Sequence, residues 1–107
     1  MVTYHKQILS YKLFLQLGPY AEDQYAASIQ LFMSDDINVY IKFLSERKTI
    51  PVNVKIGNYY KVYSPISRFV NFMDTLRNEK PCYFHFNETT KTANVGTHIE
   101  PVGEGED

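Results

Sequence analysis

Residues 64–81, which read SPISRFVNFMDTLRNEKP, contain the clearest periodic pattern in the chain. Ser64 and Pro65 are typical of a helix N-cap and of the first helical position, and Pro81 disfavours helical dihedrals in the residue before it. The apolar residues between them recur with the 3.6-residue period of an amphipathic helix; they are Ile66, Phe69, Val70, Met73 and Leu76. This stretch therefore predicts one helix over residues 65–80, whose apolar stripe covers the face of a sheet.

The sequence on both sides of this helix alternates with period two, which is the pattern of half-buried strands. The alternating segments are 9–17, 25–33, 37–43, 50–56, 59–63, 82–87 and 92–99. They predict an α+β fold, in which the helix is inserted after the fifth strand. We expect a curved antiparallel sheet or partial barrel of about seven strands.

Apolar alternation also predicts the register of the first three strands. Leu15 faces Ala27 and Leu13 faces Ile29 across the first pair, and a three-residue turn at 34–36 sets Leu31 against Val39. A helix over residues 21–32 remains the alternative to the second strand.

The two strands after the helix pair in the same way. In this register Phe84 faces Val95, and the outward pair of Tyr83 with Gly96 suits a ring lying across bare backbone.

The 107 residues predict a single domain over residues 1–99, followed by an acidic tail over residues 100–107. The net charge of −1 is far from the strongly basic composition of a dedicated nucleic-acid binder. We expect neither a membrane partner nor a signal peptide, and the single cysteine, Cys82, fits a reducing compartment. The sequence therefore predicts a cytoplasmic protein.

Few residues suggest a catalytic or metal-binding site. Cys82 and His85 lie three apart on a strand, so they point to opposite faces, and Cys82 is expected in the core. His85 and His98 share a face and could begin a metal site, but zinc needs three or four ligands. Asp35 and Asp36 are typical of a turn. We therefore expect no catalytic residue, no cofactor and no metal.

A second set of residues combines aromatic rings with cations around the fourth and fifth strands. Rings that stack on bases, together with cations that attract phosphates, are the composition of a single-stranded nucleic-acid platform. Lysines on outward strand positions also prevent aggregation between sheet edges. The candidate binding surface is Tyr40, Lys42, Lys55, Tyr59, Tyr60, Lys61 and Tyr63.

The first three strands also carry apolar residues on the face opposite their main stripe, such as Phe14, Phe32 and Leu44. One helix cannot cover both faces, so a second sheet, a partner subunit or a ligand is implied. The first functional hypothesis is a non-enzymatic interaction module. It is expected to be a homodimer that binds a protein or a small apolar ligand through a Tyr-rich sheet face. Single-stranded nucleic-acid binding is the alternative.

The C-terminal third resembles small uncharacterised bacterial proteins, some of them carried as mobile gene cassettes. The resemblance lies in Asn78-Glu79-Lys80-Pro81, in Tyr83-Phe84 and in the ending EPVGEGE over residues 100–106. It implies a bacterial, cytoplasmic, single-domain protein and carries over no active site.

Overall fold

The computed structural model describes residues 3–17, 25–45 and 49–97. These residues form eight strands, a short 3-10 helix and one α-helix. The strands are β1 (Thr3–Gln7), β2 (Ser10–Leu15), β3 (Ala27–Phe32), β4 (Asn38–Leu44), β5 (Val54–Ile56), β6 (Tyr59–Pro65), β7 (Cys82–Asn87) and β8 (Thr92–Thr97). The 3-10 helix η1 (Ile66–Arg68) leads directly into α1 (Phe69–Asn78).

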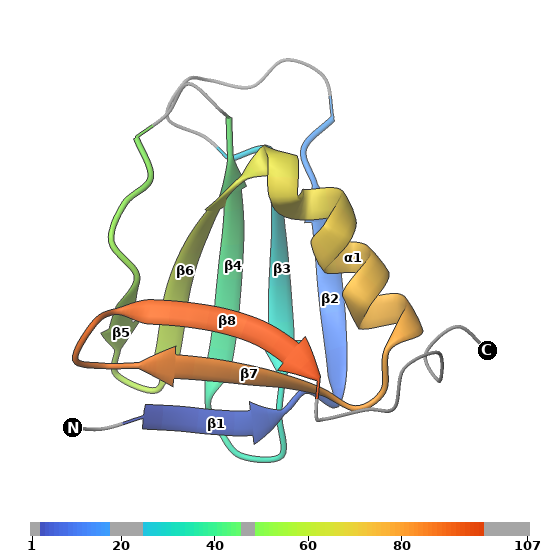
Figure 1. The fold of residues 1–107 in the computed structure, drawn as a ribbon. Helices are drawn as coiled ribbons and strands as arrows, with labels where there is room; N and C mark the ends of the chain where they lie inside the picture. The colour runs from blue at the N-terminus through green and yellow to red at the C-terminus, as the bar shows by residue number, and fades with distance from the viewer. Residues whose placement is uncertain (1–2, 18–24, 46–48, 98–107) are drawn as a thin grey trace.

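The strands form two sheets, as Figure 1 shows. The large sheet has the order β2-β3-β4-β6-β5, and the small sheet has the order β1-β7-β8. The small sheet and α1 lie side by side against one face of the large sheet, which we call its inner face (Figure 1). The opposite side of the large sheet is its outer face.

The α+β class and the single inserted helix are confirmed, and so are the predicted registers. Leu15 pairs with Ala27, Leu13 with Ile29 and Leu31 with Val39. In the small sheet, the Phe84–Val95 and Tyr83–Gly96 pairs also form as predicted. Strand β3 excludes a helix over residues 27–32, while the first part of that alternative, residues 20–24, lies outside the described residues.

The sheet architecture differs from the prediction in three respects. There are two sheets, not closed into a barrel, instead of one, and the described strands number eight instead of about seven. β4 and β6 run parallel, whereas an all-antiparallel sheet was expected. The predicted strand over residues 50–56 is a strand only over Val54–Ile56.

The additional strand is β1, which sequence alternation did not reveal. Four of its five side chains are exposed, so it lacks the apolar alternation of a half-buried strand. Its exception is Tyr4, whose ring lies 5.2 Å from that of Tyr60 and 6.1 Å from that of Phe84. A single inward ring gives too weak a period-two signal to detect.

The helix also differs from the prediction, both in where it starts and in which residues form its apolar stripe. Ser64 is not the N-cap, because the 3-10 turn begins after Pro65 and no side chain caps it. Val70 is 66% exposed, while Phe72 packs on the core in its place. Phe69 and Phe72 both lie against Phe43 of the inner face, with ring centroids 5.1 and 5.6 Å away.

The hydrophobic core lies between the inner face and its two covering layers. Its buried residues come from β3, β4, β6, α1 and β7. Two tyrosines connect the layers through their hydroxyls. Tyr4 donates to Asp35 at 3.0 Å, and Glu88 in the β7–β8 turn lies close enough to the Tyr60 hydroxyl to raise its pKa. The small sheet thus shares the cover of the inner face with α1, so this face does not itself need a partner subunit, while Phe14 on the outer face is 51% exposed.

In the described part of the chain, no helix is both long and apolar enough to cross a membrane. The acidic tail predicted over residues 100–107 lies outside the described residues, as does His98.

Candidate functional site

The outer face of the large sheet gathers lysines and aromatic rings. Register places Lys12, Gln30, Tyr40 and Lys61 in one row across β2, β3, β4 and β6. These residues belong to a shallow groove of about 530 Å³. Its lining, which we call the basic-aromatic face, is Lys12, Phe14, Tyr25, Ser28, Gln30, Tyr40, Lys42, Tyr59 and Lys61.

The predicted surface residues divide between the two faces. Tyr40, Lys42, Tyr59 and Lys61 come together in the basic-aromatic face. Tyr63 is paired with Lys42 across β4 and β6, so it shares their face without lining the groove.

Tyr60 and Lys55 belong to the opposite face. Tyr60 is 1% exposed and its ring lies 4.6 Å from that of Phe86, so it is a core residue. Lys55 pairs with Tyr60 in register and its ammonium lies 5.9 Å from the centre of that ring. Because side chains alternate along a strand, neither residue can reach the groove on the outer face.

Lys12, Phe14 and Tyr25 were not predicted for this surface, although the sequence contained the signal. The predicted pairing of Leu13 with Ile29 already sets Lys12 opposite Gln30 on the outward side. Extending that row through the third strand would have reached Tyr40. The parallel β4–β6 pair completes the row with Lys61, and that pairing was the missing step.

Two cations of the groove, Lys42 and Lys61, are close enough for the charge of one to act on the other. The ammonium of Lys42 lies 4.4 Å from the centre of the Tyr25 ring. Burial and then the charge of Lys61 lower the pKa of Lys42. Among residues 3–17, 25–45 and 49–97, no Asp or Glu lines the groove, so the described lining carries a net positive charge.

Aromatic rings flank these lysines on both sides. Phe14 and Tyr25 form one edge-to-face pair, with centroids 6.4 Å apart, and Phe14 is 51% exposed. Tyr40 and Tyr59 form the other pair at 5.6 Å, and Gln30 donates a hydrogen bond of 3.3 Å to the Tyr40 hydroxyl. The rings therefore have defined orientations on an open face.

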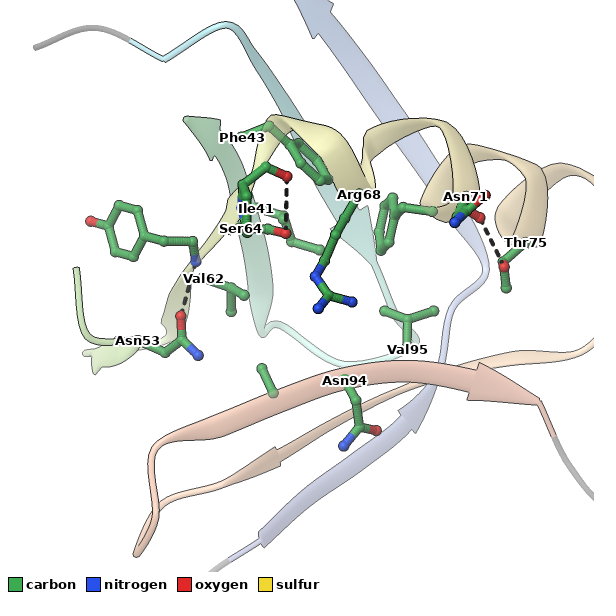
Figure 2. A pocket seen from close by; sticks show the side chains of 14 residues that line it. Ile41, Phe43, Asn53, Val62, Ser64, Arg68, Asn71, Thr75, Asn94 and Val95 are labelled. Carbon is green, nitrogen blue, oxygen red and sulfur yellow. Dashed lines mark hydrogen bonds between the residues drawn. The ribbon is translucent and has the colours of Figure 1, made fainter. Parts of the chain in front are cut away.

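A second cavity, of about 440 Å³, lies between α1, β6 and β8. Figure 2 shows its apolar floor, to which Phe43, Val62 and Val95 contribute, and the Arg68 side chain reaching into the opening. The described residues that line it include no His, Cys, Asp, Glu or Lys.

The structure separates Cys82 from His85, as predicted, but it places an unpredicted histidine beside His85. Cys82 is buried and His85 is half-buried on the opposite side of β7, as expected. The Sγ of Cys82 lies 3.1 Å from the Glu79 carbonyl oxygen. The imidazole beside His85 is that of His5, on the unpredicted strand β1. No group of three or more metal-ligating side chains occurs within residues 3–17, 25–45 and 49–97.

No known protein family, no curated protein and no solved structure matches this chain.

Proposed function

We propose that the protein is a non-enzymatic binding module that takes single-stranded nucleic acid on its basic-aromatic face. The observation that carries this proposal is the gathering of three lysines and four rings in one open groove, whose described lining contains no carboxylate. Of the two functional hypotheses drawn from the sequence, the geometry thus favours the alternative.

The electrostatics of the groove support an anionic ligand. Lys42 is partly desolvated and close to Lys61, so its charged form is disfavoured in the free protein. A phosphate placed between these two ammonium groups would relieve that repulsion and form charge-assisted hydrogen bonds. Groups arranged at a cost to the free protein are typical of binding sites.

The rings support a ligand that also contains bases. Stacking on aromatic side chains tolerates any base, because every base has a π-face. Phe14 and Tyr25 border the groove on the β2 side, while Tyr40 and Tyr59 lie across β4 and β6. A single nucleic-acid strand lying across the outer face would contact both aromatic rings and cations. Single-stranded binding surfaces combine these two kinds of contact.

The test is the binding of a fluorescently labelled single-stranded oligonucleotide, followed by anisotropy at several salt concentrations. The double variant Lys42→Glu/Lys61→Glu should lower the affinity by at least about tenfold, and the affinity of the wild type should fall steeply with salt. The matched control is Lys55→Glu, which changes a lysine of the same sheet on its other face. No binding at low salt, or an equal loss in the control, would contradict the proposal.

The homodimer of the first hypothesis is a second proposal, and it is supported by the edge of the large sheet. β2 is an edge strand; Leu15, its last residue, is 49% exposed, and Leu17, two residues further on, is 82% exposed. An exposed apolar edge strand is a template for pairing with a second copy. Sedimentation velocity should show a dimer that Leu15→Lys dissociates, whereas a strict monomer at high concentration would remove this proposal.

A further inference from the structure

The two layers that cover the inner face of the large sheet leave the second cavity between them. α1 supplies one wall through Phe72, and β8 of the small sheet supplies the other through Val95. Both side chains pack on the core but are only half-buried, so part of each faces the opening. The floor comes from the large sheet, where Ile41 and Val62 are paired in the β4–β6 register. The volume of about 440 Å³ lies within the range of small-molecule sites.

Hydrogen bonds from Asn53 join the two sheets beside this cavity. Asn53 lies just before β5 and belongs to the lining. Its Oδ1 accepts a hydrogen bond of 2.9 Å from the backbone N–H of Tyr63 in β6. Its Nδ2 donates one of 3.0 Å to the backbone carbonyl of Lys91 in the β7–β8 turn. The small sheet is thus fixed to the large one at this point, as expected of a site that is formed before its ligand binds.

Arg68 brings a positive charge to this apolar space. It is the last residue of η1 and is exposed, and Figure 2 shows its side chain reaching into the opening. Among the described residues of the lining there is no Asp or Glu to neutralise it. The hydroxyl of Thr75, also in the lining, already donates to the Asn71 carbonyl within α1 at 3.0 Å. A guanidinium binds a carboxylate through two parallel N–H···O bonds, so Arg68 suits a planar anion.

We propose that this cavity binds a small amphipathic carboxylate, with its apolar body between Phe72 and Val95 and its carboxylate at Arg68. Apolar walls that hold the body of a ligand, with a polar group that fixes its orientation, are the usual division of a small-molecule site. A neutral ligand of the same shape should bind less tightly, because it offers no charge to the guanidinium. The site lies on the inner face and is independent of the function proposed for the outer face.

The test compares octanoate with 1-octanol, which has the same apolar chain and no charge. Each is titrated into the isotope-labelled full chain and followed in amide correlation NMR spectra. Octanoate should shift the resonances of Val62, Phe72 and Val95, which line the cavity. It should bind about fivefold more tightly than octanol or better, because only the carboxylate forms charge-assisted hydrogen bonds. Equal affinities of the two probes, or no saturable shift with octanoate, would overturn the proposal.

Arg68→Gln separates the charge from the apolar cavity. Because Arg68 is exposed, this variant should keep the fold; its affinity for octanoate should fall to that for octanol, which should not change. Arg77→Gln is the matched control, since Arg77 is exposed on the same helix outside the lining and the change of net charge is the same. An equal loss in both variants would contradict a specific role of Arg68. Octanoate shifts confined to the surroundings of Lys42 and Lys61 would place the carboxylate on the basic-aromatic face and overturn the assignment.

Discussion

The two faces of the large sheet are built by alternate residues of the same strands, yet they differ in burial and in charge. On the inner face, Ile29 and Leu31 are 0% exposed and lie under α1 and the small sheet. On the outer face, Gln30 and Lys42 are half-buried, and Lys42 has its charged form disfavoured by burial and by Lys61. The inner face therefore serves stability, whereas the outer face carries an electrostatic cost at Lys42.

The largest expected effect is on the inner face. Ile29→Ala should lower the free energy of unfolding by about 2–5 kcal/mol, because it leaves a cavity in a closely packed core. Its neighbour on the outer face supplies the control. Gln30→Ala should cost less than about 1 kcal/mol, since its hydrogen bonds of 3.3 and 3.4 Å are long. Urea denaturation followed by circular dichroism measures both, and equal losses would contradict the division between the faces.

The outer face should show the reverse pattern in binding. Tyr59→Leu should weaken oligonucleotide affinity by about 1–3 kcal/mol, which is the contribution of one base stacked on an aromatic ring. The same change should leave the urea midpoint close to that of the wild type, because leucine keeps an apolar side chain at a half-buried strand position. Anisotropy and denaturation on one preparation test both expectations. A stability loss that accounts for the binding loss would argue against a stacking role.

Tyr60 tests how the inner face accommodates a polar group. Burial, and then the charge and hydrogen bond of Glu88, raise the pKa of Tyr60 to about 12. The unfolded value is about 10, so the stability that Tyr60 contributes is complete below pH 10 and is lost as the pH rises towards 12. Tyr60→Phe should cost about 1–2 kcal/mol at pH 7.

The same variant should also show a shallower fall in stability between pH 10 and pH 12. Denaturation of the wild type and of Tyr60→Phe at several alkaline pH values measures this difference. Parallel curves would show that the Tyr60 hydroxyl is not the titrating group. Some alkaline dependence should persist in the variant, because burial and Asp35 also raise the pKa of Tyr4 above its ordinary value.

The smallest effect should come from Lys42. Because its pKa is lowered, its charge opposes folding at neutral pH, and this opposition disappears as the pH rises to the unfolded value of about 10.5. Lys42→Met should therefore raise stability at pH 7, by no more than about 0.5 kcal/mol. The gain should vanish near pH 10.5. A stability loss at pH 7 would show that Lys42 has a structural role that its position does not suggest.

Local pairing could be predicted from the sequence, while distant pairing could not. The β2–β3, β3–β4 and β7–β8 registers followed from alternating residues, because a slip by one residue would expose each apolar face. The β1–β7 pair joins residues some 80 positions apart, as in the His5–His85 contact, and β1 carries almost no apolar alternation. The parallel pairing of β4 with β6 was missed because side-chain alternation does not depend on strand direction.

Part of the candidate site could likewise be predicted, because lysines and rings at outward positions identify a face. Tyr60 was assigned to the wrong side because a tyrosine suits either face of a sheet. Tyr60 lies on the inner face because it alternates with the buried Val62, and its ring packs on Phe84 and Phe86 of the small sheet. The His5–His85 pair depended on β1 and could not be predicted for that reason.

The pairing of β1 with β7 has a consequence for the order of events during synthesis. A ribosome releases the strands of the large sheet before it has translated residues 82–87, which pair with β1 among the described strands. β1 therefore emerges well before its partner strand, so its edge stays unpaired while the large sheet collapses. The sequence TYHKQ of β1 is mostly polar. A segment with few apolar side chains is less prone to aggregate while its partner strand is still missing.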